Sequence, residues 1–392
     1  MIKVLILTNS FAIGGTEAAL NSLLKMMNPE EYQITVLAIT KEGPLLKEVP
    51  GTVKIKQLLF TKSKYRIFVS GRKEKTDSIK TLAAKIEKKY YYFKYKQNAE
   101  KNHLYEKILE YTSPLEGEYD LLLDFHGYGY FLTAYGAECI KAKKKAMWIH
   151  DENIWWLYKV VSYLGKYDKI FCVSQAVKTS LLKNFPEYKE KAEVFYNVTD
   201  TERIKRMADD ALNDERYRGN RKILTIGRME EQKGYDVAIE AAEILKNRNI
   251  AFQWFFMGDG NLRQELEKFV KKKGLEKNII FLGKKSNPYP YIKNCNLYVQ
   301  PSRHEGYATT IFEARVLKKI IVASDIPSNR EQIKTGINGY LEILKGEAFA
   351  ERIEGILQGK EHTEKIIGNL ENENLDFAGE MKKLDKLLKE RK

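Results

Sequence analysis

Short apolar runs alternate with longer amphipathic stretches along most of the chain. The runs are bounded by glycine, proline or polar residues, as buried strands are. Between most of them apolar residues recur at helical spacing, and this alternation predicts α/β architecture with a parallel sheet wrapped by helices. In the first half the predicted strands are residues 3–8, 33–39, 53–60, 120–125, 146–150, 169–174 and 193–196.

The alternation stops at a polar segment, residues 197–220, and then restarts. Helices are expected from Tyr235 and Asn261. A second doubly wound sheet is therefore predicted, and ligands of such sheets bind outside the carboxyl ends of the strands. Two such sheets facing a central cleft would bring both sets of loops together. The predicted strands of this half are residues 221–226, 252–257, 278–282, 296–300 and 320–323.

The length of 392 residues favours two domains, and 43% hydrophobic with 31% charged residues is typical of a folded protein. We predict a first Rossmann-like domain over residues 1–197 and a second over 198–345. Helices are expected in 346–392, where they can pack back on the first domain.

Three cysteines, Cys139, Cys172 and Cys295, lie far apart in or near apolar runs. They are expected to be buried free thiols in a reducing compartment, which indicates a cytoplasmic protein. The opening apolar run is too short for a signal peptide and is predicted to be the first strand. No segment approaches the roughly 18 apolar residues that span a bilayer, so any membrane association would be peripheral.

The net charge of +14 is uneven, because residues 61–110 hold 14 Lys and Arg against 6 Asp and Glu. Aromatic residues lie among these cations, and the mixture suits the headgroup layer of an anionic membrane. A solvated helix with its aromatic residues packed inward is the alternative. No nucleic-acid recognition motif accompanies the charge, which disfavours that partner. The candidate membrane residues are Lys85, Lys88, Lys89, Tyr91, Tyr92, Lys94 and Lys96.

Two carboxylates eight positions apart follow the predicted strand 296–300. A proline and Gly306 break the strand, and Thr309 and Thr310 are expected to cap the helix that follows. A helix N-terminus beside a glycine attracts phosphate. Glu305 is expected to point beyond the strand ends and Glu313 to lie in the first helical turn, where it can accept hydrogen bonds from hydroxyls. A sugar attached to a phosphate would suit both.

Two cations, Arg228 and Lys233, lie five positions apart in the glycine-bounded loop after strand 221–226. Arginine grips phosphate oxygens through its planar fork and lysine adds a point charge, so the pair can neutralise a diphosphate leaving group. The alternative is a surface loop with two incidental cations.

Other strand ends carry weaker signals. Gly14 and Gly15 allow close approach to a ligand and Thr16 can cap the next helix, although a plain turn would look the same; the spacing is not that of a dinucleotide site. His150 ends a strand, where it can contact a substrate hydroxyl or be a structural imidazole held by Asp151. The turn at residues 258–260 is either structural or borders a nucleobase. The histidines are dispersed, so no metal site is predicted.

Taken together, these motifs resemble glycosyltransferase family 4, whose members are retaining GT-B enzymes that use nucleotide sugars. The resemblance spans most of the chain in architecture, with its most specific motifs between residues 221 and 340. The residues that carry it are Gly14-Gly15-Thr16-Glu17, His150, Asn197, Gly227-Arg228, Lys233-Gly234, Gly258-Asp259-Gly260, Glu305-Gly306, Glu313 and Thr335-Gly336-Ile337-Asn338-Gly339-Tyr340.

The resemblance implies a role for each site residue. Arg228 and Lys233 would hold the donor diphosphate, Glu313 the ribose hydroxyls and Glu305 those of the transferred sugar, while His150 would contact that sugar. Gly15 would close against the diphosphate. The implied donor-binding residues are Gly15, Gly227, Arg228, Lys233, Gly258, Glu305, Gly306, Tyr307, Ala308, Thr309, Thr310 and Glu313, and the implied catalytic residues are His150, Arg228, Lys233 and Glu305.

The implied chemistry is transfer from a UDP sugar, favoured over a GDP sugar, to a glycan, lipid-linked or surface-polysaccharide hydroxyl. Retention by front-face attack, with the departing phosphate helping to deprotonate the acceptor, requires no protein base, metal or cofactor. Ala308 stands where many members have a second glycine, and this variant resembles members that build bacterial capsules, which leaves the donor sugar open.

Two alternatives share the fold. A catalytically silent partner of a glycosyltransferase would usually lack the cations or the glutamates, and all four are present. An epimerase would need acid and base residues across the cleft. A phosphorylase, a further alternative, would require a lysine-bound pyridoxal cofactor.

Overall fold

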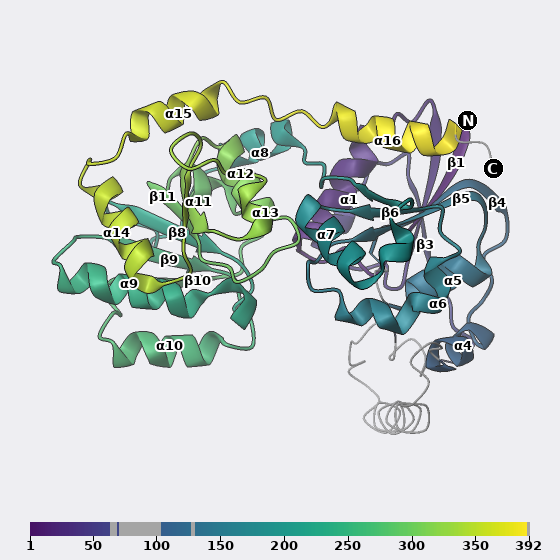
Figure 1. Ribbon diagram of the computed structural model, residues 1–392, viewed down its shortest axis with the longest axis horizontal. Coiled ribbons are helices and arrows are strands. Elements are labelled where there is room, and N and C mark those ends of the chain that lie inside the picture. Colours follow the sequence, from purple (N-terminus) through teal and green to yellow (C-terminus); the bar gives the residue numbers. More distant parts are fainter. Residues whose placement is uncertain (63–68, 70–102, 127–129, 390–392) are drawn as a thin grey trace. The chain divides into compact units, whose positions relative to one another are not determined.

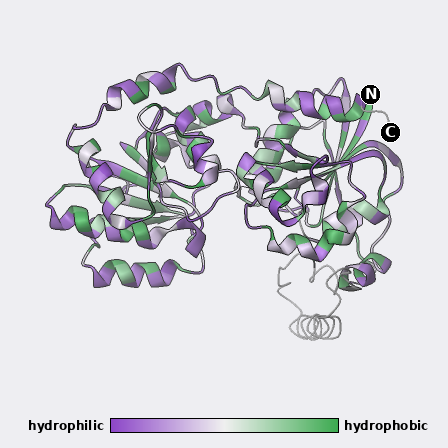
Figure 2. Cartoon of the chain, in the orientation of Figure 1, coloured by the Kyte–Doolittle hydropathy of each residue, from purple (hydrophilic) through white to green (hydrophobic). Residues whose placement is uncertain are grey.

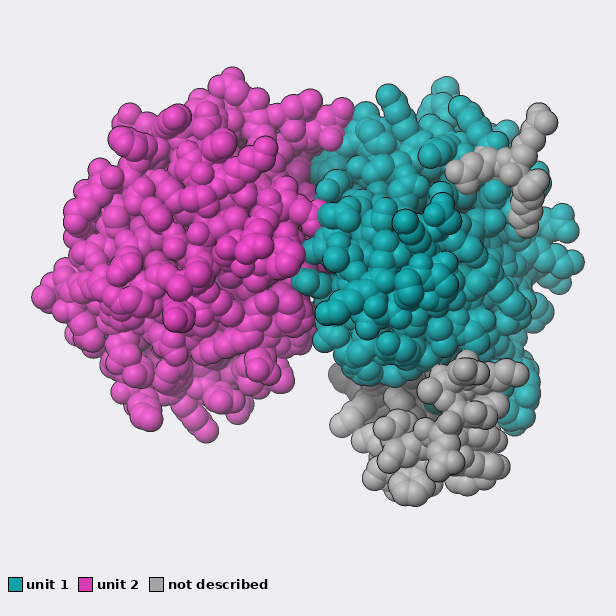
Figure 3. Space-filling view, in the orientation of Figure 1, with its two compact units in different colours: residues 1–199, 377–392 teal, residues 200–376 magenta. Residues whose placement is uncertain are grey.

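The computed structural model describes residues 1–62, 69, 103–126 and 130–389. The chain divides into two compact units, coloured separately in Figure 3. The first unit comprises Met1–Thr199 and Phe377–Lys392, and the second comprises Asp200–Asp376.

The first unit is built on a seven-stranded sheet in the order β3-β2-β1-β4-β5-β6-β7, with every pair parallel (Figure 1). Its strands are β1 (Ile2–Thr8), β2 (Tyr32–Ala38), β3 (Lys54–Gln57), β4 (Glu118–Asp124), β5 (Lys141–Ile149), β6 (Lys169–Cys172) and β7 (Ala192–Val194). Its described helices are α1 (Gly15–Met26), η1 (Pro44–Glu48), α4 (His103–Glu110), α5 (Phe131–Cys139), η2 (Trp155–Val160), α6 (Val161–Leu164), α7 (Gln175–Asn184), η3 (Pro186–Tyr188) and α16 (Ala378–Lys389).

The second unit repeats the scheme with a six-stranded parallel sheet in the order β10-β9-β8-β11-β12-β13. Its strands are β8 (Lys222–Ile226), β9 (Gln253–Met257), β10 (Ile279–Gly283), β11 (Leu297–Gln300), β12 (Ile320–Ser324) and β13 (Tyr340–Glu342). Its helices are α8 (Thr201–Ala208), η4 (Glu231–Lys233), α9 (Tyr235–Asn247), α10 (Arg263–Lys272), α11 (Tyr289–Lys293), α12 (Thr309–Val316), α13 (Pro327–Arg330), α14 (Gly346–Leu357) and α15 (Thr363–Glu371).

Alternate side chains of each strand in the second unit face opposite layers of helices. Trp254 and Phe256 point into a buried core shared with α9, α10, α14 and α15. Helices α8, α11 and α12 contact one another and form a separate group. Figure 2 shows hydrophobic residues along the strands of both sheets, as expected for parallel strands buried on both faces.

Every predicted strand overlaps a strand of the structure, so the predicted α/β architecture with two parallel sheets is confirmed. Strand β13 was missed, because a run of three residues carries little periodicity. Helices α14 and α15 lie in the second unit, which extends to residue 376, while α16 lies in the first. There the hydroxyl of Tyr32 donates to Asp385 (2.6 Å) and Nζ of Lys383 donates to the carbonyl of Val194 (2.7 Å).

Candidate functional site

The loops that follow β8, β9 and β10 are joined by main-chain hydrogen bonds. The N–H of Gly227 donates to the carbonyl of Met257 (3.0 Å), that of Met229 to Asp259 (3.1 Å), and that of Gly258 to Gly283 (3.0 Å). These loops lie at the carboxyl ends of their strands, where parallel sheets bind ligands. The cation-bearing loop is therefore held firmly at that edge.

Two glycines allow this close approach. Gly258 has φ +139°, and a Cβ there would lie 1.8 Å from the carbonyl oxygen of Gly227. Gly234 has φ +63°, and its Cβ would lie 1.8 Å from the carbonyl oxygen of Pro301. Both positions exclude any other side chain on conformational and steric grounds. The turn at residues 258–260 thus has a structural role, one of its two predicted roles.

Polar contacts also join the loop after β8 to the loop after β11. Nε2 of Gln232 donates to the carbonyl of His304 (2.9 Å), and the N–H of Arg303 donates to the carbonyl of Gln232 (2.7 Å). The guanidinium of Arg303 binds Asp236 through both carboxylate oxygens, at 2.9 and 2.6 Å. The two loops that carry the predicted cations and Glu305 therefore form one rigid edge.

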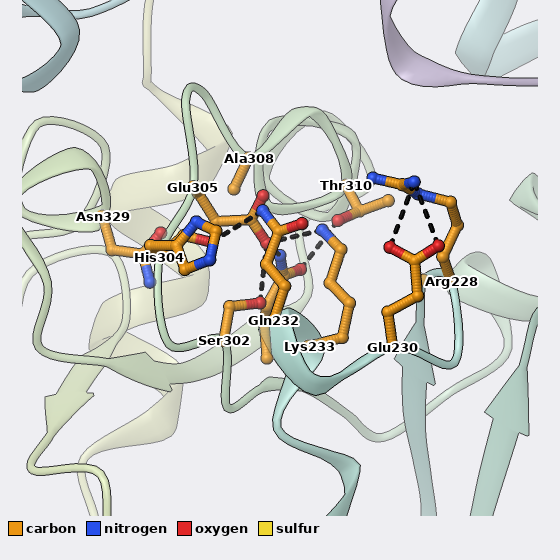
Figure 4. A network of polar contacts seen from close by, with 12 residues as sticks. Arg228, Glu230, Gln232, Lys233, Ser302, His304, Glu305, Ala308, Thr310 and Asn329 are labelled. Atoms are coloured by element: carbon orange, nitrogen blue, oxygen red, sulfur yellow. Dashed lines mark hydrogen bonds and ion pairs between the residues drawn. The ribbon is translucent and has the colours of Figure 1, made fainter. Parts of the chain in front are cut away.

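Lys233 and Glu305 meet at the centre of this edge (Figure 4). Nζ of Lys233 lies 2.5 Å from Oε1 of Glu305, and the side chains are only 17% and 7% exposed. Gly227 leaves room for the lysine stem, because a Cβ there would lie 3.1 Å from Cδ of Lys233. The predicted convergence of this cation with the first carboxylate is found in the structure.

Two further donors hold Glu305. Nε2 of Gln300 (2.8 Å) and Oγ of Ser302 (2.6 Å) both donate to Oε1. Oε1 of Gln300 in turn accepts from the hydroxyls of Tyr298 and Thr310, each at 2.7 Å. Gln300 is 1% exposed. The contacts from Lys233, Gln300 and Ser302 all end on Oε1 of Glu305, so Oε2 is the oxygen that Glu305 can offer to a ligand.

Arg228 lies on the same loop but has a different partner. Its guanidinium contacts Glu230 at 3.1 Å, and the arginine side chain is 65% exposed. Figure 4 shows the Arg228–Glu230 pair beside the Lys233–Glu305 contact. An exposed pair of this kind is weak, so a phosphate can displace Glu230 at little cost.

Two predicted details of helix α12 were wrong. The helix begins at Thr309 with Ala308 as N-cap, and no side chain caps it. Thr309 and Thr310 both lie inside the helix, and the hydroxyl of Thr310 donates to Oε1 of Gln300. Glu313 consequently lies in the second turn rather than the first. The same error occurred at α1, where Gly14 is the N-cap and Thr16 makes no capping bond.

The hydroxyl of Tyr289 donates to Oε1 of Glu313 at 3.2 Å. Glu313 is partly buried by accessible surface, and the protein around it displaces enough water to raise the pKa of its carboxyl to about 7. Its protonation therefore changes near neutral pH. The sequence contained no signal for Tyr289, which lies 24 positions away.

The predicted residues of the first unit lie at the carboxyl edge of its own sheet. Gly15 is the first residue of α1, and His150 follows β5. Nε2 of His150 lies 2.7 Å from the carbonyl oxygen of Phe125, and burial lowers the pKa of the imidazole to about 3. The ring is therefore neutral and Nε2 carries the proton.

His126, which the sequence analysis did not single out, lies beside this group. It follows β4, contacts the hydroxyl of Thr8 at 3.3 Å, and burial lowers its pKa to about 4. His150 is thus not alone in following a strand of this sheet, since His126 comes two residues after β4 ends at Asp124.

Several other predictions can be placed only in part. The seven candidate membrane residues between Lys85 and Lys96 lie outside the described residues. Among the described helices, none is long and apolar enough to cross a bilayer. Cys172 and Cys295 are buried free thiols as predicted, whereas Cys139 is half-buried because it ends α5. Within the same residues, no cluster of three His, Cys, Asp or Glu side chains has the arrangement of metal ligands.

Comparison with known proteins finds similarity to glycosyltransferases in the second unit. Residues 208–373 match the family described as Glycosyl transferases group 1. The chain is 27% identical over 176 residues to an uncharacterized glycosyltransferase of Methanocaldococcus jannaschii, covering 44% of this chain and 43% of that protein.

A second relative, from Campylobacter jejuni, is named N-acetylgalactosamine-N,N'-diacetylbacillosaminyl-diphospho-undecaprenol 4-alpha-N-acetylgalactosaminyltransferase. It is 29% identical over 170 residues, covering 43% of this chain and 44% of that protein. The chain thus matches less than half the length of these curated relatives.

The crystal structure of HepE from Anabaena in complex with UDP and glucose resembles the whole chain, with a TM-score of 0.72, 17% identity and 100% of both chains covered. At this identity the likeness establishes the fold alone, and that fold is GT-B.

Proposed function

We propose that this protein is a glycosyltransferase that takes its sugar from a nucleoside diphosphate sugar bound to the second unit. The observation that carries the proposal is the contact between Lys233 and Glu305, which joins a cation and a carboxylate at the carboxyl edge of a parallel sheet. The match of residues 208–373 to Glycosyl transferases group 1 covers both residues.

The residues suit a donor of this kind. Lys233 and Arg228 would bind the diphosphate and stabilise the charge that develops as it departs. Oε2 of Glu305 would accept a hydrogen bond from the transferred sugar, since Oε1 is already occupied. Glu313 would bind the ribose. The backbone N–H groups at the start of α12 would face the sugar and the distal phosphate.

The finer assignment is a retaining hexosyl or N-acetylhexosaminyl transfer of family 4, without a metal. A front-face reaction is proposed because the leaving phosphate can take the acceptor proton, so no protein base is needed. UDP sugars are favoured as donors, and the HepE structure was solved with UDP and glucose. The C. jejuni relative is named for a diphospho-undecaprenol acceptor, which supports a lipid-linked or surface-polysaccharide acceptor here.

The test is a panel of UDP and GDP sugars incubated with the full chain, with release of nucleoside diphosphate measured in the presence and absence of lipid-linked acceptors. We expect slow hydrolysis of one donor and faster release with an acceptor. Isomerised donor without release would indicate an epimerase instead. No turnover and no nucleotide binding would indicate a silent partner and would refute the proposal.

The same proposal places the protein at the cytoplasmic membrane face, bound through residues 61–110. Sedimentation with anionic and neutral vesicles tests this, with salt-sensitive binding expected for anionic vesicles alone. Equal sedimentation with both would show that the segment does not bind membrane.

A further inference from the structure

A tyrosine and an arginine lie behind Glu313, each on a different helix. Tyr289, at the start of α11, donates its hydroxyl hydrogen to Oε1 of Glu313 at 3.2 Å. Nη1 of Arg203, on α8, donates to the oxygen of that hydroxyl at 3.1 Å. The guanidinium also lies over the Tyr289 ring, 5.7 Å from its centroid. The three side chains therefore form a hydrogen-bond network that runs from Arg203 through Tyr289 to Glu313.

The hydrogen-bond donors and acceptors of these side chains fix the direction of each bond in this network. A guanidinium can only donate, so the Tyr289 oxygen accepts from Arg203. The single hydroxyl hydrogen of Tyr289 is then left for the carboxylate of Glu313. The hydrogen bond to Glu313 is thus held in one orientation, which in turn fixes the orientation of the carboxylate.

The backbone segments that carry Tyr289 and Arg203 are themselves held by hydrogen bonds. Tyr289 is 5% exposed, and its N–H donates to Oδ1 of Asn287 at 3.1 Å. Nδ2 of Asn287 donates to the carbonyl of Met207 at 2.8 Å, which ties this turn to α8. Asp200 caps α8 by accepting from the N–H of Arg203 at 2.8 Å. Helices α8 and α11, which carry Arg203 and Tyr289, are therefore held together by hydrogen bonds.

We propose that Tyr289 and Arg203 are positioning residues that hold the carboxylate of Glu313 for the ribose hydroxyls of the nucleotide. The inference rests on the proposed function, and it adds two residues from outside the sequence motifs. They act through Glu313 and touch no substrate themselves.

The charged and titratable groups that face Glu313 are Arg203 on α8, Tyr289 on α11 and Tyr298 on β11. Burial raises the pKa of Glu313, while the Tyr289 hydrogen bond and the Arg203 charge lower it. Loss of the Tyr289 hydroxyl should therefore raise this pKa further. A carboxylate accepts hydroxyl hydrogen bonds better than a carboxylic acid does. As the pH is lowered, the nucleotide affinity of such a variant would therefore begin to fall at a higher pH than that of the wild type.

The experiment measures binding of UDP and of 2′,3′-dideoxyUDP, which lacks both ribose hydroxyls, to the full chain by calorimetry. Tyr289→Phe should weaken UDP binding about 10-fold, the effect of one hydrogen bond to a charged group, and leave dideoxyUDP binding within about twofold. As the pH is lowered, its UDP affinity should also begin to fall at a higher pH than that of the wild type. Arg203→Gln should act in the same direction, which keeps the test valid if one variant does not fold.

Tyr217→Phe is the matched control. Its buried hydroxyl donates to the carbonyl of Tyr291 (2.8 Å), so it touches α11 without touching Glu313, and neither affinity should change. Equal weakening of both nucleotides by Tyr289→Phe, or no weakening of either, would overturn the inference. Wild-type protein that binds UDP and dideoxyUDP equally would also overturn it, while leaving the donor class intact. If the wild type binds neither UDP nor GDP, the proposed function itself fails.

Discussion

Replacing Lys233 by methionine separates the structural role of the Lys233–Glu305 contact from its role in binding. The substitution keeps an apolar stem beside Gly227 and removes the charge from Oε1 of Glu305. Removing one partner of a buried ion pair costs about 3–5 kcal/mol when the other charge is left alone. Here Gln300 and Ser302 still donate to Glu305 at 2.8 and 2.6 Å, so the carboxylate is not left without partners.

We therefore expect a smaller loss of about 2 kcal/mol in the free energy of unfolding of the second unit. For a domain of this size that loss lowers the Tm by about 4–8 °C. The loss in the free energy of UDP binding should be a larger fraction of its total than the loss in the free energy of unfolding. One charge-assisted hydrogen bond to phosphate is worth about 1.5–3 kcal/mol, which weakens UDP binding by about 10- to 150-fold.

The assay is calorimetric titration with UDP, performed at a temperature well below the melting transition of the variant. Lys246→Met is the control, because Nζ of Lys246 on α9 donates to the carbonyl of Gly274 (2.8 Å), away from the site. This control should bind UDP like the wild type. If Lys233→Met binds UDP within about twofold of the wild type while its Tm falls as expected, the lysine is purely structural and the reasoning is refuted.

Three further predictions follow from single contacts. Gly234→Ala should lower the Tm more than Gly274→Ala, because both glycines have φ near +60° (+63° and +62°) but only Gly234 would meet a carbonyl oxygen, at 1.8 Å; equal losses would contradict the clash. Since the pKa of Glu313 is raised to about 7 from 4.5, the folded state binds the proton more tightly, so stability should fall as pH rises between these values. In Glu313→Gln, the free energy of unfolding measured with urea should change less with pH over this range. An unchanged pH dependence would contradict the assignment. Tyr32→Phe removes the bond to Asp385 (2.6 Å) and should release α16 to limited proteolysis, with cleavage no faster than in the wild type as the opposing result.

Both parallel sheets were predictable because strands buried on two faces form apolar runs, whatever the tertiary context. Lys233 and Glu305 could be expected near one ligand because both follow strands whose carboxyl ends share one edge, but their direct contact was not predicted. Strand β13 could not be found, since its three residues depend on pairing with β12 rather than on their own pattern.

The contacts behind the site could not be predicted from local sequence. The role of Gln300 depends on its burial and on Thr310, whose hydroxyl the sequence had suggested as a helix cap. Tyr289 and Arg203 reach Glu313 from different helices, at separations that no motif spans. The main-chain bonds that join the loops involve no side chain and leave no mark in composition.

The most direct test is a crystal structure of the full chain with a bound UDP sugar. The account predicts the diphosphate against Lys233 and Arg228, with Glu230 displaced, the ribose against Glu313, and the sugar against Oε2 of Glu305. A nucleotide found at another edge of the second unit, or one that leaves the Lys233–Glu305 contact and Glu313 untouched, would contradict it.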